Sequence, residues 1–341
     1  MNDTDVAVSN GTPKELLIFK AFGISLAVLA NIIGNSFCLV VIRLNTQMEQ
    51  VTRILMTSAT VADLSTAIFV STPILGATIA DRWPFGELFC TVSSTMGTLF
   101  VMCCIGSLLL LNAERYIAIT RPFHYSSLMT PGRARVAVVV IWTSSVILST
   151  ISSTCMPQRT SKYSPSLHSC IVSAVRQNEH DISGNVVIVT FILAPIAIIL
   201  FMYIRIFAIA RGHAKRIADI AVIVAAPKPA DGSRRKQTIR PQKKAFTTFF
   251  LMVLALVLFS FPLMVVFIYE NATSRELPRV YIYVAEISAM TIGLWNLVIY
   301  YARNAAFRQT AKRVIVYVFP CIHFSKDDVL DFTSSRTNVK S

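Results

Sequence analysis

Charged side chains that stand inside apolar segments are the first candidates for chemistry in this chain. Asp63 and Glu286 each lie alone among apolar or small residues. Glu114 stands directly before Arg115, after a stretch from 88 to 113 that contains no charged residue. A charge in such surroundings is costly unless it is paired or used, so we expect these four side chains to bind an ion, a ligand or one another.

Enzymatic or metal chemistry would need clusters that this sequence does not offer. An enzyme site would require two carboxylates, a His pair or an activated Ser or Cys in one constellation. The histidines fall in expected loops or in the C-terminal tail, without metal-ligand spacing: His124, His168, His180, His213 and His323. We therefore predict no enzyme, no metal site and no cofactor.

Long apolar segments are expected to position the charges. Of the 341 residues, 54% are hydrophobic and 15% are charged, whereas about a quarter are charged in a typical soluble domain. A helix of roughly 20 apolar residues crosses the hydrocarbon of a bilayer, which strands with open edges cannot do. We predict an all-α membrane protein, a seven-transmembrane helix bundle with spans at about 17–42, 54–79, 88–113, 136–157, 183–204, 245–269 and 280–302.

The segments outside these spans complete the predicted organisation. Residues 1–16 form an N-terminal segment, 17–302 the bundle and 320–341 a tail. Apolar residues at helical spacing among basic ones predict an amphipathic helix on the membrane surface at 303–319. The run 225–244 is rich in Pro, Gly and charge, so we expect it to be largely disordered.

The net charge of +14 is distributed as a topology signal. The N-terminal segment, with Lys20 included, and the loops near 81, 160–182 and 270–279 carry 8 Lys+Arg and 9 Asp+Glu, whereas the other side carries 24 Lys+Arg and 7 Asp+Glu. Positive charge stays cytoplasmic during insertion, which predicts an extracellular N-terminus and a cytoplasmic C-terminus. The basic surplus favours contact with the lipid bilayer and not with nucleic acid.

Two kinds of modification fit this topology. The sequons at Asn2, Asn10 and Asn271 all fall on the predicted outer side, where glycosylation can occur. Cys321 follows the amphipathic helix, where a palmitoyl chain would add a second anchor. A buried reduced thiol is the alternative interpretation of Cys321.

The pattern as a whole resembles the rhodopsin-like (class A) family of G-protein-coupled receptors over about residues 17 to 321. Each residue that carries the resemblance is weak alone, but together and in order on seven spans they are specific. In chain order they are Gly34-Asn35, Val61-Ala62-Asp63-Leu64, Trp83-Pro84-Phe85-Gly86, Cys90, Glu114-Arg115-Tyr116, Pro122, Trp142, Pro195, Tyr203, Pro262, Asn296 and Tyr300. The resemblance implies a plasma-membrane receptor that binds an extracellular ligand and activates a heterotrimeric G protein.

Coupling to the G protein is implied for one set of residues. Glu114 is expected to hold Arg115 until activation moves span six outward and opens a cavity for the G-protein α subunit. Gln242 stands where many relatives carry an acid that also holds this arginine, which predicts a looser resting state with some basal activity. The coupling residues implied are Glu114, Arg115, Tyr116, Tyr203, Asn296 and Tyr300.

A polar hub is implied around Asp63, with Asn35 and Asn296 as its partners. In the family this cluster holds a sodium ion. Here Cys104 replaces the supporting hydroxyl of span three. A hydrogen-bonded hub is therefore favoured over a sodium site.

The resemblance also implies a disulfide between Cys90, at the top of span three, and Cys170, in the second outer loop. That loop would form a lid over the pocket. Both cysteines lie on the predicted outer side, where oxidation can occur.

The ligand pocket is implied to be mostly apolar and comprises Gly97, Thr98, Val101, Phe191, Ser260, Met264, Phe267, Glu286 and Met290. Amine receptors carry an aspartate at the position of Gly97, and opsins a lysine at that of Met290, so neither class is indicated. Glu286 would either contact a cationic ligand group, such as a peptide amine, or pair with a tyrosine, water or a basic loop residue. A peptide, a small polar cation and a lipid all remain open as ligands.

Two departures from the family pattern affect coupling. Ser260 stands in place of the usual tryptophan switch, and Leu297 in place of a proline, so span seven is expected to be straighter. These changes keep open an atypical receptor, either a scavenger or an arrestin-biased one. Thr238 follows a basic run suited to kinases that prefer arginine upstream. Phosphorylation of the tail cluster Thr333, Ser334, Ser335 and Thr337, for example by receptor kinases, would make it acidic enough to recruit arrestin.

Overall fold

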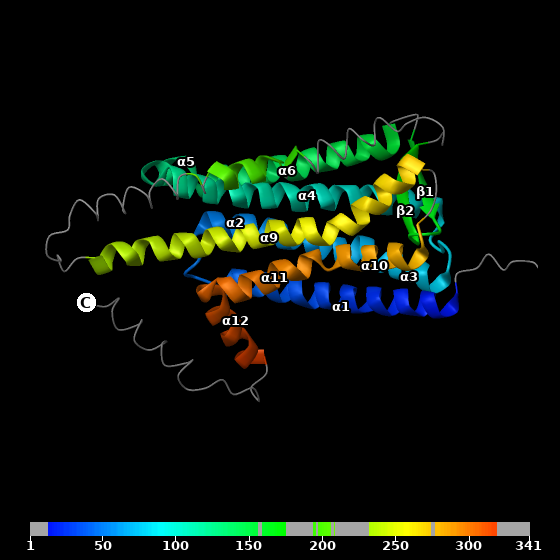
Figure 1. The fold of residues 1–341 in the computed structure, drawn as a ribbon, viewed down its shortest axis with the longest axis horizontal. Helices are drawn as coiled ribbons and strands as arrows, with labels where there is room; N and C mark the ends of the chain where they lie inside the picture. The colour runs from blue at the N-terminus through cyan, green and yellow to red at the C-terminus, as the bar shows by residue number, and fades with distance from the viewer. Residues whose placement is uncertain are drawn as a thin grey trace, which may run out of the picture.

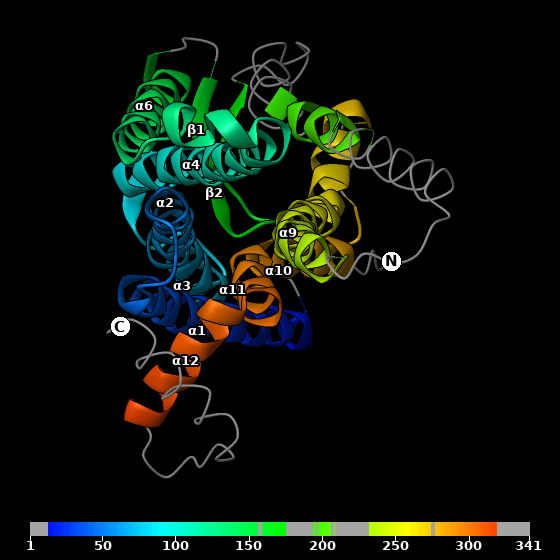
Figure 2. The ribbon, with the colours of Figure 1, turned by 90° about the vertical axis from the view of Figure 1, so that its left-hand side faces the viewer.

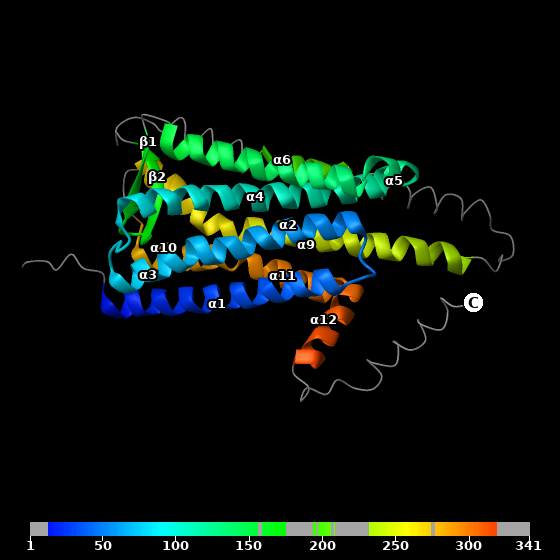
Figure 3. The same cartoon turned by 180° about the vertical axis from the view of Figure 1, so that it is seen from behind.

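A bundle of long helices with a small hairpin at one end forms the described part of the chain (Figure 1). The computed structural model describes residues 13–155, 159–174, 194–195, 197–205, 208, 232–273 and 277–318. Strands β1 (Arg159–Ser164) and β2 (Ser169–Ala174) pair antiparallel, with Tyr163 opposite Cys170. We call the end of the bundle that carries this hairpin the hairpin end. The opposite end, where the last helix lies across the bundle (Figure 3), is the α12 end.

The helices run side by side between these two ends, as the view along the bundle in Figure 2 shows. Among the described residues, five helical segments are long and apolar enough to cross a membrane, and α10 with α11 form a sixth span as a bent pair. Part of the expected fifth span, residues 197–205, is helical. The seven-transmembrane fold class is confirmed. The elements are α1 (Lys14–Leu44), α2 (Gln50–Thr66), the π-helical turn η1 (Ala67–Ser71), α3 (Thr72–Ala80), α4 (Gly86–Thr120), η2 (Pro122–His124), α5 (Tyr125–Leu128), α6 (Pro131–Thr150), η3 (Ile151–Cys155), α9 (Gly232–Thr273), α10 (Arg279–Met290), α11 (Ile292–Arg303) and α12 (Ala305–Val318).

An exposed apolar stripe on α1 shows how the bundle meets its surroundings. Ile18, Phe22, Leu26, Leu29 and Ile33 are each more than half exposed. Their spacing of three or four residues places them on one face of the helix. An apolar stripe of this length on an outer helix face is what contact with lipid requires.

Two helices extend further than the hydropathy pattern predicts. α4 continues to Thr120, so Arg115 lies inside the helix and not at its end. α9 begins at Gly232, within the run expected to be largely disordered, so that expectation was wrong from 232 onward. Lys, Arg and Gln are good helix formers, and a helix can therefore continue past the apolar segment into water.

Span seven is bent, although Leu297 replaces the proline. α10 and α11 meet at 43° around Thr291, so the expectation of a straighter span was wrong. The Asn31 amide on α1 donates to the Met290 carbonyl at 2.8 Å, and the Thr291 N–H bonds to Ser288 O at 3.1 Å in a tighter turn. A side chain that enters the backbone ladder bends a helix without any proline.

The amphipathic helix after the last span is present as α12. Phe307 and Ala311 are fully buried against the bundle, and the Phe307 ring lies 5.9 Å from the ring of Tyr300. The predicted apolar face of this helix therefore packs on the base of span seven.

Candidate functional site

An arginine cluster lies near the α12 end and consists of Thr52, Glu114, Arg115 and Tyr125. Arg115 Nε lies 2.8 Å from Glu114 Oε2, and Arg115 Nη2 donates to Thr52 Oγ1 at 2.5 Å. Tyr125 donates to Glu114 Oε1 at 2.6 Å, so both carboxylate oxygens are occupied. The expected ion pair is therefore present, with the Glu114 side chain fully buried and that of Arg115 22% exposed.

The hydroxyl of Tyr125 stays protonated and donates its hydrogen bond to Glu114. Burial raises the pKa of Tyr125, and its hydrogen bond to Glu114 raises the pKa further. The phenol stays protonated at neutral pH and holds the carboxylate toward Arg115. Thr52 and Tyr125 were not identified from the sequence, because neither has a distinctive motif around it.

The other coupling candidates lie in three places. Tyr203 donates to Asn112 Oδ1 at 2.5 Å, and Tyr116 packs against the same group of side chains between α4 and α9. Tyr300 is buried in the main core beside α12. Asn296, by contrast, belongs to the polar hub around Asp63.

Asp63 accepts two hydrogen bonds in the hub. Asn296 Nδ2 donates to Asp63 Oδ2 at 2.9 Å, and Cys104 Sγ donates to Asp63 Oδ1 at 3.3 Å. Asn35 was expected to bind Asp63, but its amide donates instead to the carbonyl of Asn31 at 3.1 Å. Asn31 was missed in the sequence, although it lies one helical turn before Asn35 and on the same face.

The approach of span seven to the hub depends on Gly293. A Cβ built at Gly293 would lie 2.7 Å from Asn31 Oδ1 and 3.1 Å from Asp63 Cβ. The Asn31 amide already binds the carbonyls of Ala27 and Met290, so it is not free to rotate away. Glycine at this position therefore permits the contact between α11 and the hub.

We predict that Gly293→Ala lowers the free energy of unfolding by about 1–3 kcal/mol, because the added methyl overpacks the hub. Gly97→Ala is the matched control, since its Cβ would meet nothing closer than Val70 at 3.8 Å. Thermal unfolding followed with a thiol-reactive dye measures both, because Cys38, Cys103 and Cys104 are buried in the folded protein. Equal melting temperatures for the two variants would contradict the packing argument.

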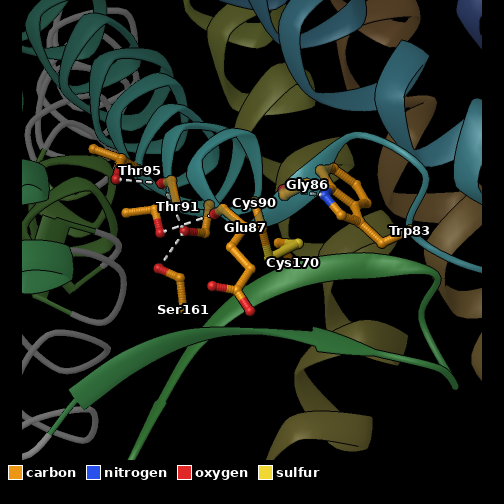
Figure 4. Close-up of a disulfide and its surroundings, with 9 residues drawn as sticks. Trp83, Gly86, Glu87, Cys90, Thr91, Thr95, Ser161 and Cys170 are labelled. Carbon is orange, nitrogen blue, oxygen red and sulfur yellow. Dashed lines mark hydrogen bonds between the residues drawn. A yellow bond between two sulfur atoms is a disulfide. The ribbon is translucent and has the colours of Figure 1, made fainter.

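A disulfide ties the hairpin to the bundle (Figure 4). Cys90 of α4 and Cys170 of β2 are bonded, with their Cα atoms 5.3 Å apart, which confirms the expected pairing. Ser94 of α4 and Ser161 of β1 share a hydrogen bond of 2.8 Å. Both strands are thus held over the mouth of the bundle.

A buried cation at the hairpin end changes the interpretation of Glu286. Lys20 of α1 is fully buried, and its Nζ lies 2.8 Å from Glu286 Oε2. The same Nζ donates to the Leu167 carbonyl at 2.7 Å and lies 4.3 Å from the centre of the Tyr283 ring. The sequence places Glu286 alone among apolar residues, but the structure pairs it with the ammonium group of Lys20.

Lys20 could have been recognised. It lies inside the predicted span 17–42, although the charge count above assigns it to the N-terminal segment. A lysine near a helix end usually extends its amine toward water. Its burial here follows from the presence of the Glu286 carboxylate across the helix interface.

The remaining pocket candidates are partly buried, with two exceptions. Val101 is 45% exposed, and Phe191 lies outside the described residues. Ser260 donates to the Leu256 carbonyl of its own helix, so its hydroxyl is engaged. Phe267 packs beside Leu167 at the hairpin tip. Those of intermediate burial are Gly97, Thr98, Ser260, Met264, Phe267 and Met290.

Several further expectations concern parts that the structure does not describe. Asn2, Asn10, Cys321 and the tail cluster 333–337 lie outside the described residues, as do the side chains of Thr238, Gln242 and Asn271. Among the described residues, no group of three or more His, Cys, Asp or Glu side chains could hold a metal ion.

Membrane-spanning helices, an ion-paired arginine near one end and a disulfide-tied hairpin at the other define the class of protein as a seven-helix membrane receptor. Residues 34–300 match the family described as 7 transmembrane receptor (rhodopsin family). The chain belongs to this family, as the sequence predicted, and is a multi-pass plasma-membrane receptor and not an enzyme.

Individual receptors of known sequence or structure are also similar to this chain. The histamine H2 receptor of Cavia porcellus is 27% identical over 345 residues, which cover 96% of this chain and 90% of that receptor. The D(1A) dopamine receptor of Didelphis virginiana is 31% identical over 214 residues, which cover 60% of this chain and 47% of that receptor. The crystal structure of squid rhodopsin matches with a TM-score of 0.77 at 18% identity, covering 94% of this chain and 91% of that chain.

Proposed function

We propose that this receptor binds an extracellular ligand at the hairpin end and activates a heterotrimeric G protein at the α12 end. The observation that carries the proposal is the arginine cluster, in which a permanently charged guanidinium is held by a fully buried carboxylate. The charge distribution supports an extracellular N-terminus and a cytoplasmic C-terminus. Arg115 then faces the compartment that contains G proteins.

The ligand is proposed to differ from histamine and dopamine, the amines after which the similar receptors are named. Gly97 provides no counter-ion for an amine, and the Glu286 carboxylate is already paired with Lys20. A cationic ligand would have to displace that lysine from a buried site. We therefore favour a ligand, such as a peptide or a lipid, that is held mainly by apolar contacts and hydrogen bonds.

Receptor-stimulated nucleotide exchange on a panel of G proteins tests the proposed function. We expect wild-type receptor in membranes to exceed empty membranes, and Arg115→Ala to reduce the excess at least about tenfold, as expected when a charged contact of about 1.5 kcal/mol or more is lost. Arg133→Ala is the control, because Arg133 is exposed and its guanidinium donates to the loop carbonyls of Ser127 and Leu128. If basal nucleotide exchange with wild-type receptor equals that of empty membranes, the assay is repeated with pools of candidate ligands added.

An exchange signal that survives Arg115→Ala unchanged would contradict the proposed mechanism. Arrestin recruitment without nucleotide exchange would instead support the atypical scavenger or arrestin-biased receptor. The departures at Ser260 and Leu297 are the features that favour this second candidate.

A further inference from the structure

The tip of the hairpin is held by a chain of polar contacts that we call the tip cluster: Lys20, Asp81, Leu167, His168 and Glu286. His168 is 1% exposed. Its Nδ1 lies 3.1 Å from Lys20 Nζ, and its Nε2 lies 3.0 Å from Asp81 Oδ1. The cluster therefore connects α1, the turn after α3, the hairpin and α10.

These contacts allow only one protonation state of His168. An ammonium group has donors and no acceptor, so Nδ1 must accept the hydrogen bond from Lys20. A carboxylate accepts only, so Nε2 must carry the proton that is donated to Asp81. A second proton, on Nδ1, would replace the Lys20 hydrogen bond with a contact between two positive charges.

Other charged and titratable groups surround the imidazole. Burial lowers the pKa of His168, Asp81 raises it, and Lys20 and Arg279 lower it. The Glu286 carboxylate is paired with Lys20. The groups facing His168 are Lys20 of α1, Asp81 after α3, Tyr163 of β1, and Arg279, Tyr283 and Glu286 of α10.

The turn of the hairpin and the strand pair beside it are fastened differently. Cys170 is covalently bonded to α4, whereas Leu167 and His168 are held by packing and hydrogen bonds alone. Leu167 packs against Val266 and Tyr283 and is 3% exposed. Loss of the Lys20 contact would therefore free the turn at 165–168, while the disulfide at Cys170 keeps the adjoining strand attached to α4.

We propose that His168 is a proton-binding site that regulates this receptor, in which uptake of an extracellular proton releases the hairpin tip from α1 and opens the mouth of the bundle. The inference rests on the proposed function only for the extracellular orientation of the hairpin end. The docked tip requires neutral His168, so docking is fully stable above the ordinary histidine pKa of about 6.5 and weakens as the pH falls below it. Linkage of one proton changes the docked-to-released ratio by up to about tenfold per pH unit.

Hydrogen exchange of purified receptor in lipid nanodiscs, followed by mass spectrometry between pH 5 and 7.5, measures tip release without a G protein or a ligand. After correction for intrinsic exchange rates, we expect protection of peptides covering 161–170 to fall by up to about tenfold per pH unit below about 6.5. Peptides from α2 should keep their protection across this range. His168→Gln keeps one donor and one acceptor but does not titrate, so its profile should be flat.

Two controls make the result specific. Glu87→Gln, an exposed carboxylate on the same outer face, should leave the wild-type profile unchanged. His168→Asn is a second non-titrating variant, because asparagine tolerates the left-handed backbone of His168 at φ 54°. It replaces His168→Gln if that variant does not fold.

Either of two outcomes would overturn the proposal. One is a wild-type profile that does not depend on pH, and the other is a dependence that persists in both His168 variants, which would assign titration to Asp81 or Glu286. Nucleotide exchange measured on the same preparations reports separately on the proposed function. The two measurements thereby distinguish failure of the proton-binding proposal from failure of the proposed receptor function.

Discussion

Lys20→Met is expected to destabilise the receptor by about 3–5 kcal/mol, the largest effect of any single substitution we propose. The change leaves the Glu286 carboxylate buried without its cation, and a buried charge that loses its partner is strongly destabilising. The hairpin also loses the hydrogen bond from Nζ to the Leu167 carbonyl. The midpoint of thermal unfolding, followed through the buried thiols, measures the loss.

A double substitution separates charge pairing from simple packing. Lys20→Met with Glu286→Leu removes both charges and keeps a similar volume, and replacement of a buried ion pair by apolar residues is often neutral or stabilising. We expect the double variant to regain most of the stability that Lys20→Met loses. If the two substitutions were simply additive, Lys20 would stabilise the protein through packing and not through Glu286.

Glu114→Gln is expected to raise ligand-independent nucleotide exchange about tenfold. Glutamine still accepts the hydrogen bond from Tyr125 but no longer carries the charge that holds Arg115. Weakening a charge-assisted contact by about 1.5 kcal/mol changes the equilibrium between the held and released arginine about tenfold. Nucleotide exchange on the G protein that couples to the wild type is the measurement.

Glu87→Gln is the matched control for this effect, since Glu87 lies on the same helix at the hairpin end and is exposed. It should leave basal exchange unchanged. Combining Glu114→Gln with Arg115→Ala should abolish the increase, because there is then no guanidinium to release. Basal exchange of Glu114→Gln at or below the wild-type level would mean that the ion pair does not restrain Arg115.

The two charge pairs described above have different structural roles. The pair of Glu114 and Arg115 joins neighbours on one helix, so its rupture frees a side chain without separating helices. The pair of Lys20 and Glu286 joins α1 to α10 and supports the hairpin tip. Its loss would therefore loosen the packing of the outer mouth as well as remove a contact.

The sequence alone determined the class of the protein, and its resemblance to the family implied the disulfide. Hydrophobicity is a property of each segment by itself, and lipid allows such segments little except helices, so span positions follow from local composition. The Glu114-Arg115-Tyr116 motif and Cys90 are also local signals. Even the amphipathic helix α12 is visible as a periodic pattern, because its burial depends on one face of a single helix.

Only the tertiary structure decided which polar groups meet. The partner of Glu286 is Lys20, which lies at the other end of the chain, and no local pattern relates the two positions. Asn35 binds Asn31 instead of Asp63, and an amide from α1 bends span seven where a proline was missing. Each of these contacts is set by how helices approach and rotate against one another. That arrangement is a property of the whole bundle and is not encoded in any one segment.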